Sequence, residues 1–287
     1  MIPPRAVKFF VLSVLAAASA FIWTIVFAGA GKDLSVSFLN IGQGDSIFIE
    51  APNGNQILID GGSGGAVVRE LGKIIPPYDH SIDIVLATHP DKDHTGGLND
   101  VLEKFSVSYF IEPGVPADTL AWTALLKKIE EKNIPHIYAR RGTEIDLGGG
   151  AKLSVLYPDR DVSREKDTNN ASIIAMLSYG ASRVLLTGDA PQSAERNLIV
   201  KDGEKLRADI LKLGHHGSRT SSAQEFLAAV HPAYAVISAG CKNSYGHPHQ
   251  EVLGLLLKFK IPKLATCDGG TVTFRSDGEK ITYKTIR

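Results

Sequence analysis

Hydrophobic and polar positions divide the chain into two unequal parts that meet near Gly31. From Phe9 to Ala30 the chain runs for 22 residues without a charged side chain. A helix of that length can span the hydrocarbon core of a bilayer, and the run is longer than the apolar stretch of an ordinary signal peptide, which is about 7–15 residues. We therefore expect residues 1–32 to form a signal anchor whose membrane-inserted part is residues 9–30.

Two basic residues decide the expected orientation of this anchor. Arg5 and Lys8 precede the apolar run, and basic residues on one flank favour the cytoplasmic side. The rest of the chain is then expected outside the cytoplasm, as the globular part of a single-pass cell-membrane protein. Cleavage after Ala30 is the alternative, because Ala28-Gly29-Ala30 is similar to a signal-peptidase site; the protein would then be secreted.

Beyond the anchor, short β-like runs alternate with turns and with amphipathic segments. Three runs between residues 35 and 62 are rich in β-branched and aromatic side chains and predict an antiparallel meander. Residues 82–89 have the continuous apolar character of a buried strand, and residues 118–133 have the spacing of an amphipathic helix. Because no repeat or long linker divides this part, residues 33–287 predict a single layered α/β domain.

Composition and charge narrow the classes of partner. The chain has 31 basic and 31 acidic side chains, so no net positive field gathers nucleic acid at long range. Any contact with nucleic acid must be local or mediated by a metal. Cys241 and Cys267 are too few for a disulfide framework, and whether they pair is left open, since sequence distance says nothing about their geometry.

Chemistry-bearing residues gather where apolar, strand-like runs end. His89 follows IVLAT, Asp189 follows RVLLTG, and a histidine pair follows DILKLG. Six of the nine histidines lie in such loops, namely His89, His94, His215, His216, His247 and His249. Loops beyond strand ends are where the sites of α/β proteins assemble, so we expect these loops to converge.

The stretch THPDKDHTGG is the densest of these clusters and predicts a metal centre. His89 and Asp91 can hold one cation while Asp93 and His94 face a second. Asp189 is placed to bridge the two cations, and a histidine of HHGS completes the ligands of the second cation. Mixed imidazole and carboxylate ligands favour Zn²⁺, Mn²⁺ or Fe²⁺ over Ca²⁺ or Mg²⁺. Two such ions about 3.5–4 Å apart generate a hydroxide nucleophile and stabilise charge on a phosphoryl or acyl oxygen. The alternative for the stretch alone is a solvated, charged turn.

These motifs resemble the metallo-β-lactamase superfamily, whose metal-binding signature is usually His-x-His-x-Asp-His. Asp91 stands at the place of the second histidine. That variant, with FLNIGQGDSIFIEAPNGNQILIDGG, TNNASIIAML, RVLLTGDA, LKLGHHGSRTSS and ISAGCKNSYGHPH, resembles the hydrolase domain of ComEC-type DNA-uptake proteins from about Leu34 to the C-terminus. The resemblance implies a four-layer αββα sandwich, here preceded by one transmembrane helix, with two divalent ions, Zn or Mn, along one edge.

The resemblance also implies which residues bind metal. The signature residues and Asp189 become ligands, and His215 becomes the late histidine ligand with His216 as the alternative. The superfamily often has a further histidine before the strand that leads to Asp189, and this chain has none there. Asn169 or Asn170 could supply an oxygen or hold a water instead, and the first ion would then be bound more weakly or be Mn²⁺ rather than Zn²⁺.

Catalysis is expected to depend on Asp93, His216 and His247. A histidine with a pKa near 6.5 can protonate a leaving alkoxide at neutral pH, which makes His247 a general acid or a phosphate contact. The alternative is that His247 only packs beside Pro248. Asp45, in the glycine turn NIGQGD, is expected behind the metal ligands.

Three functions follow from these expectations. The first is a membrane-anchored, extracytoplasmic, metal-dependent phosphodiesterase, a nuclease acting on single-stranded DNA in a competence or DNA-uptake context. The second is a hydrolase of a small phosphodiester, such as a phosphocholine-type ester on a wall polymer or lipid. The third is a non-catalytic, metal-stabilised partner of a DNA channel. ComEC-type proteins that move DNA carry a multi-helix channel, and this chain has one expected span, so a separate membrane channel subunit is a possible partner.

Overall fold

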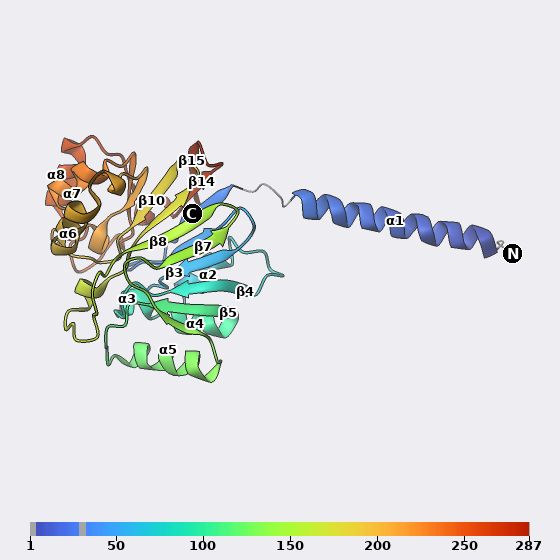
Figure 1. The fold of residues 1–287 in the computed structure, drawn as a ribbon, viewed down its shortest axis with the longest axis horizontal. Coiled ribbons are helices and arrows are strands. Elements are labelled where there is room, and N and C mark those ends of the chain that lie inside the picture. Colours follow the sequence, from blue (N-terminus) through green and yellow to red (C-terminus); the bar gives the residue numbers. More distant parts are fainter. Residues whose placement is uncertain (1–3, 29–32, 287) are drawn as a thin grey trace.

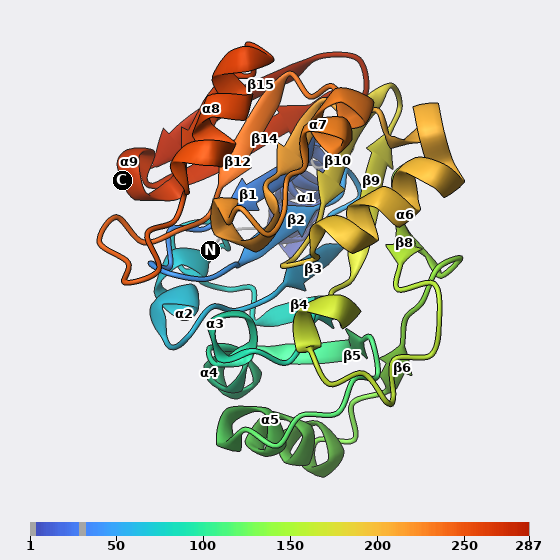
Figure 2. The same ribbon diagram turned by 90° about the vertical axis from the view of Figure 1, so that its left-hand side faces the viewer.

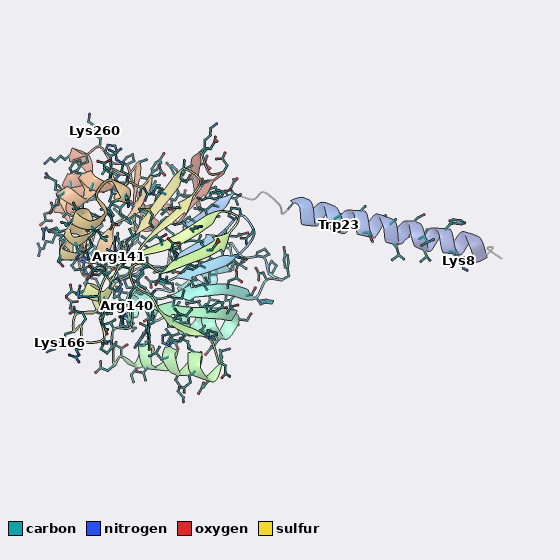
Figure 3. All side chains as sticks on the ribbon, in the orientation of Figure 1. Lys8, Trp23, Arg140, Arg141, Lys166 and Lys260 are labelled. Carbon is teal, nitrogen blue, oxygen red and sulfur yellow. A yellow bond between two sulfur atoms is a disulfide. The ribbon has the colours of Figure 1, made fainter. Side chains whose placement is uncertain are left out.

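The computed structural model describes residues 4–28 and 33–286, which form one long helix and a sandwich of two sheets (Figure 1). Helix α1 (Pro4–Ala28) runs away from the sheets and carries Lys8 and Trp23 along its length (Figure 3). Within these described residues, no helix combines the length and the hydropathy that a bilayer crossing requires. The end of the expected span at residues 29–30, with its cleavage point, lies outside the described residues.

The first sheet holds eight strands of the described chain, in the order β15-β14-β1-β2-β3-β4-β5-β6. Its strands are β1 (Leu34–Phe38), β2 (Ile47–Glu50), β3 (Gln56–Ile59), β4 (Ser81–Leu86), β5 (Ser106–Glu112), β6 (His136–Tyr138), β14 (Thr271–Ser276) and β15 (Ile281–Ile286). The first three pair antiparallel, which is the meander that the sequence predicts. From β3 to β6 the strands run parallel, so β3 and β4 end at the same edge.

The second sheet holds seven strands of the same described part, in the order β13-β12-β11-β10-β9-β8-β7. Its strands are β7 (Glu144–Gly148), β8 (Ala151–Tyr157), β9 (Ile174–Tyr179), β10 (Ser182–Leu186), β11 (Ile210–Lys212), β12 (Tyr234–Ile237) and β13 (Lys263–Ala265). From β10 to β13 the strands are parallel. The loops that leave β10, β11 and β12 therefore share one edge.

Helices cover the outer faces of both sheets (Figure 2). The elements outside the sheets are α2 (Ala66–Leu71), α3 (Lys92–Thr95), α4 (Leu98–Lys104), α5 (Leu120–Glu131), α6 (Gln192–Asp202), α7 (Gln224–Val230), α8 (Gln250–Lys258), α9 (Thr266–Gly269) and the 3₁₀ turns η1 (Thr168–Ala171), η2 (Gly203–Leu206) and η3 (Gly214–Gly217). Apolar residues of α2, α4 and α5 pack on the first sheet, and those of α6, α7 and α8 pack on the second. Side chains such as Phe38, Ile49, Leu153 and Leu177 fill the space between the sheets. These layers give the αββα sandwich that the motifs imply.

Helix α5 illustrates how the sequence pattern produces a layer. Trp122, Leu125 and Ile129 are buried at helical spacing and face the sheet. The hydroxyl of Thr119 caps the helix by accepting from the Trp122 N–H at 3.3 Å.

A disulfide joins Cys241, in the loop after β12, to Cys267 in α9. The bond ties this loop to the last part of the second sheet. The sequence left the pairing open, because only the fold brings the two thiols together.

Candidate metal centre

Loops from both sheets meet at the edge where the parallel strands end. His89 follows β4, His94 lies in α3, and His216 lies in η3 after β11. The imidazole rings of His89 and His94 are 4.1 Å apart, and those of His94 and His216 are 5.3 Å apart. Residues more than one hundred positions apart in the sequence thus form one cluster, as their placement after strand ends predicts.

The centre of this cluster is a compact set of buried acids and imidazoles. Ligand atoms of Asp45, His94, Asp189 and His216 all lie within 4.8 Å of one another. Asp189 Oδ1 is 3.3 Å from His94 Nε2, and Asp189 Oδ2 is 3.4 Å from His216 Nε2. Asp93 Oδ2 lies 3.3 Å from the same His216 nitrogen. Asp189 therefore stands between the two histidines, where a bridging carboxylate is expected.

Several polar atoms of the cluster are buried without a hydrogen bond. They are His89 Nε2, His94 Nε2, His216 Nε2, Asp45 Oδ1 and Asp189 Oδ1. Buried polar atoms in folded proteins nearly always have a partner, because desolvating them otherwise costs free energy. Imidazole nitrogens and carboxylate oxygens that point at one another without bonding fit the donor set of a transition metal.

The opposite nitrogen of each imidazole is held by the protein. His94 Nδ1 is 2.8 Å from Asp60 Oδ2, and His216 Nδ1 is 2.9 Å from the Ser238 carbonyl oxygen. His89 Nδ1 is 3.1 Å from the hydroxyl of Thr88. Such contacts fix the ring orientation and leave Nε2 as the metal-binding atom.

The two adjacent histidines of HHGS occupy different positions. His216 has a side chain that is 1% exposed and faces Asp93 and Asp189. The His215 side chain is 27% exposed, its Nε2 is 3.7 Å from Asp189 Oδ2, and its Nδ1 is 3.1 Å from the Thr220 hydroxyl. Both residues have positive φ, 49° and 55°, a conformation that turns consecutive side chains in directions the sequence does not indicate. The structure thus places His216 inside the cluster and His215 at its rim, the reverse of the order that the resemblance implies.

The other side of the centre contains His89 and Asp91. Their nearest atoms, His89 Nε2 and Asp91 Oδ2, are 3.7 Å apart. Thr168 in η1 donates to Asp91 Oδ1 at 2.6 Å. The next residue, Asn169, has a buried Oδ1 without a hydrogen bond, whereas the Asn170 side chain bonds Glu165. Of the two asparagines, Asn169 is the one whose side-chain oxygen is buried beside the centre without a hydrogen bond.

Sequence reasoning missed two buried charged residues at the centre. Asp60, just after β3, accepts from both the N–H and the hydroxyl of Thr88, at 2.8 and 2.7 Å, and contacts His94. Lys212, the last residue of β11, forms an ion pair with Asp45 and donates to a backbone carbonyl at 2.9 Å. Both are fully buried. The available signal was a charged side chain in or at the end of an apolar strand run, in QILID and in DILKL.

The charges of the cluster set its protonation. Burial raises the pKa of Asp45 and of Asp189, but Lys212 and the nearby histidines outweigh it and hold both pKa values below the ordinary range. Burial lowers the pKa of His94, and its carboxylate neighbours outweigh that effect and raise the pKa well above the usual value. Burial similarly opposes the carboxylates around His216, which raise its pKa to about 9. The carboxylates around these two imidazoles therefore favour the protonated form of each ring while no cation is bound.

His247 lies beside the cluster but not within it. Its ring is 5.3 Å from that of His215, and its Nδ1 is buried without a hydrogen bond. Burial, assisted by the neighbouring histidines, lowers the pKa of His247 to about 4. The expected general acid required a pKa near 6.5. A neutral imidazole at pH 7 favours a phosphate contact over proton donation. Bound cations nearby would lower the pKa of His247 further.

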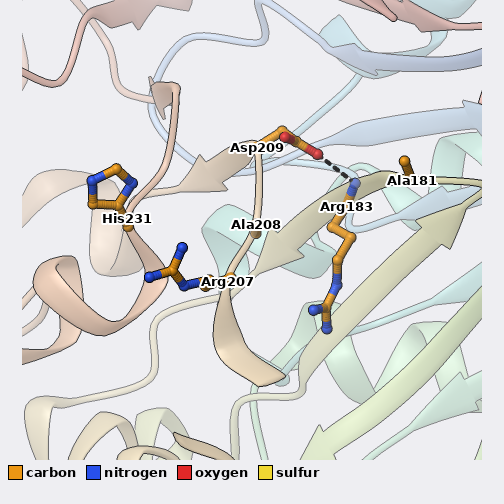
Figure 4. Close-up of a pocket in the computed structure, with 6 residues that line it drawn as sticks. All are labelled: Ala181, Arg183, Arg207, Ala208, Asp209 and His231. Atoms are coloured by element: carbon orange, nitrogen blue, oxygen red, sulfur yellow. Dashed lines mark hydrogen bonds between the residues drawn. The ribbon is translucent and has the colours of Figure 1, made fainter. Parts of the chain in front are cut away.

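A separate cavity of about 290 Å³ lies where β10 and β11 begin, at the end of the strands opposite to the metal centre (Figure 4). Arg183, Arg207 and His231 are among the residues that line it. The Asp209 carboxylate accepts from the backbone N–H of Arg183 at 2.8 Å, and Arg207 pairs with Glu204 at 3.2 Å. None of the expected metal ligands lines this cavity.

Comparison with known proteins agrees with the fold and the cluster. The sequence profile of the metallo-beta-lactamase superfamily matches residues 39–240. The chain therefore belongs to this superfamily, and its buried His/Asp cluster indicates the use of a divalent metal.

Curated relatives narrow the resemblance further. The chain is 31% identical over 257 residues to ComE operon protein 3 of Bacillus subtilis (strain 168), covering 84% of this chain and 33% of that protein. It is 29% identical over 250 residues to Competence protein ComA of Neisseria gonorrhoeae, covering 85% of this chain and 32% of that protein. The similarity to ComEC-type proteins is thus confirmed, although the chain spans only about a third of the length of these relatives.

A solved structure of an archaeal protein has the same fold. Igni18, a novel metallo hydrolase from the hyperthermophilic archaeon Ignicoccus hospitalis KIN4/I, superposes with a TM-score of 0.54 at 16% identity, over 84% of this chain and 98% of that chain. At this identity the likeness shows the fold alone.

Proposed function

We propose that the chain is a metal-dependent phosphodiesterase, a nuclease that acts on single-stranded DNA in a DNA-uptake context. The observation that carries the proposal is the pair of buried, unbonded Nε2 atoms of His94 and His216, which face Asp93 and Asp189. A packed core gains nothing from such a set, because unbonded buried nitrogens and carboxylates are costly. Two divalent cations would compensate this cost.

The proposed ligands fall into two groups that share one carboxylate. His89, Asp91 and Asn169 would hold the first cation, Asp93, His94 and His216 would hold the second, and Asp189 would contribute to both. Two cations held there would activate a water molecule and stabilise the negative charge that develops on a phosphoryl oxygen.

The chain's own residues prepare this site before any cation binds. Asp60 holds the ring of His94, and the Ser238 carbonyl holds that of His216, so that both Nε2 atoms face inward. Lys212 offsets the charge of Asp45 in a region from which water is excluded. The neutral His247 is available to donate a hydrogen bond to a phosphate oxygen of the substrate.

The choice of substrate rests on charge and on the relatives. A cluster of buried carboxylates repels an anionic phosphodiester unless cations offset it, so the same cations that complete the site also admit this substrate class. One of the relatives is named a competence protein and the other is named for the ComE operon; together with the resemblance to DNA-uptake proteins, these names support DNA as the substrate in preference to a small ester.

We further propose that the uncharged run of residues 9–30, of which the structure describes residues 9–28, anchors the hydrolase domain in the cell membrane, with the domain outside the cytoplasm and a separate channel subunit as partner. Apolar side chains of α1 such as Phe9, Phe10 and Leu12 are 60–71% exposed, which suits burial in lipid. The disulfide between Cys241 and Cys267 suits an oxidising compartment.

The test is hydrolysis of bis-p-nitrophenyl phosphate and of labelled single-stranded DNA by the full chain, purified in detergent and supplied with Mn²⁺ or Zn²⁺. Asp93→Ala is expected to abolish both activities. Asp118→Ala, which removes an exposed carboxylate before α5, is the matched control and is expected to retain them.

Activity in Asp93→Ala equal to that of the wild type would exclude the proposed mechanism. Cleavage of the small ester without cleavage of DNA would leave a phosphodiesterase and remove the nuclease. A purified chain that takes up no transition metal would contradict the function as a whole.

A further inference from the structure

The loop of residues 241–249, between β12 and α8, presents an exposed aromatic ring beside the metal centre. Tyr245 is 63% exposed, and its ring is stacked on that of His247, with centroids 5.7 Å apart and an interplanar angle of 21°. The His247 ring is in turn 5.3 Å from that of His215 and 6.1 Å from that of His216. A line of rings therefore leads from solvent to one of the proposed metal ligands.

This loop is held in place by its own side chains and by a covalent bond. The Asn243 amide donates to two backbone carbonyls, one of them that of His247 at 2.6 Å. Asn243 Oδ1 accepts from the N–H groups of Tyr245 and His247 at 3.2 and 2.9 Å. The disulfide at Cys241 ties the start of the loop to α9. Because the backbone is fixed, little conformational freedom is lost when a flat ligand stacks on the tyrosine.

We propose that Tyr245 is a stacking platform for a nucleobase of the strand whose phosphodiester lies at the metal centre. The inference rests on the proposed phosphodiesterase function and deepens it, because it assigns the residue that would recognise the single-stranded form of the substrate. Bases of a duplex are stacked on one another and offer no free face, whereas a single strand does. Stacking on an aromatic side chain accepts any base, so the platform selects for single-strandedness and not for sequence.

The surroundings of the platform suit a polyanionic strand better than a small cationic ester. Lys242 lies in the same loop and is exposed. Arg219, whose backbone N–H donates to His249 at 3.2 Å, is exposed and paired at 3.6 Å with the exposed Glu251; the two cationic side chains can attract neighbouring phosphates. A choline group is best held by aromatic faces on several sides. Tyr245 and His247 instead form a stack with a ring at its exposed end, which matches a flat base.

The experiment compares a single-stranded oligonucleotide with the same strand made abasic on both sides of the scissile phosphate. The full chain is used in detergent with Mn²⁺, as wild type, Tyr245→Ala, Tyr245→Leu and Tyr245→Phe. Loss of the ring in the alanine and leucine variants is expected to lower kcat/KM on the normal strand about 5- to 150-fold, the range that base stacking contributes. Tyr245→Phe keeps a ring and is expected to retain most of the activity. On the abasic strand the four proteins are expected to differ far less.

A second tyrosine provides the matched control. Tyr78 is 83% exposed in the segment between α2 and β4, and Tyr78→Ala is expected to act on both strands as the wild type does. Quenching of a strand that carries 2-aminopurine gives a readout independent of turnover: the wild type and Tyr245→Phe are expected to quench it on binding, and Tyr245→Leu is not.

Three results would overturn the platform. Equal losses on the normal and abasic strands would mean that Tyr245 only maintains the loop. No loss on either strand would mean that no base contacts it. With p-nitrophenyl phosphorylcholine assayed as a third substrate, a loss of activity confined to that ester would make the ring a contact for the choline cation. If the wild type cleaves no phosphodiester at all, the proposed function fails, and the 2-aminopurine measurement still decides the stacking.

Discussion

Replacing Lys212 with methionine tests the electrostatic account of the metal centre. The lysine is fully buried, pairs with the buried Asp45, and lies 3.8 Å from Asp189 Oδ1. At an effective dielectric constant of about 20, one pair of charges at that distance attracts by about 4 kcal/mol. Removing one partner of a buried pair typically costs about 3–5 kcal/mol, because the other charge is left uncompensated. We expect Lys212→Met, which keeps the unbranched apolar part of the side chain and is one heavy atom shorter, to lower the free energy of unfolding of the metal-free chain by about 3–5 kcal/mol.

The assay is urea unfolding of the metal-free and metal-loaded full chain in detergent, followed by the fluorescence of the buried Trp122. The metal-loaded form is expected to lose less, because cations at Asp189 offset part of the missing charge. Adding Asp45→Asn to the lysine variant removes the uncompensated carboxylate and is expected to recover at least half of the loss. Lys127→Met, on the exposed face of α5, is the control and is expected to unfold as the wild type does. A metal-free Lys212→Met chain as stable as the wild type would refute the reasoning.

Three further predictions concern metal binding and pH. His216→Ala is expected to lose roughly one bound ion per chain while His215→Ala keeps both, as measured by elemental analysis; the opposite pattern would restore the order that the resemblance implies. Metal uptake at pH 7 is expected to release roughly two protons per chain, because carboxylates overcome burial and raise the pKa of His94 well above its usual value and that of His216 to about 9. Calorimetry in buffers of different ionisation enthalpy measures the number of protons released. Metal uptake without proton release would contradict the protonated form of the two imidazoles. Burial raises the pKa of Glu195 to about 7, although the N–H groups of Ser222 and Ala223 oppose it. The folded state therefore favours the protonated acid, and this stability is present below about pH 4.5 and lost as the pH rises through about 7. Glutamine does not titrate, so Glu195→Gln does not lose stability in this way. The free energy of unfolding of the variant minus that of the wild type should therefore rise by about 3 kcal/mol between pH 4.5 and 7.5. A difference independent of pH would exclude a raised pKa of Glu195.

The sequence by itself determined the class of fold and the place of the site. Strand and helix periodicities are local, so the meander, the α5 helix and the layered arrangement follow from short stretches of residues. Polarity after strand ends is also local, and parallel strands bring those ends to one edge. That is why His89, Asp93, His94 and Asp189 could be assigned to one centre without a structure.

The tertiary structure alone decided which atoms face one another. His215 and His216 are adjacent in sequence and both have positive φ angles, yet the fold places one side chain in the cluster and the other at its rim. The sequence shows Asp60 and Lys212 as charged residues at the ends of apolar runs, but only the sandwich places them against His94 and Asp45. The pairing of the two cysteines and the position of Tyr245 beside the centre likewise depend on how distant segments pack. Periodicity records which side of an element is buried, whereas contacts across the molecule are set by backbone angles and packing that no short stretch of sequence contains.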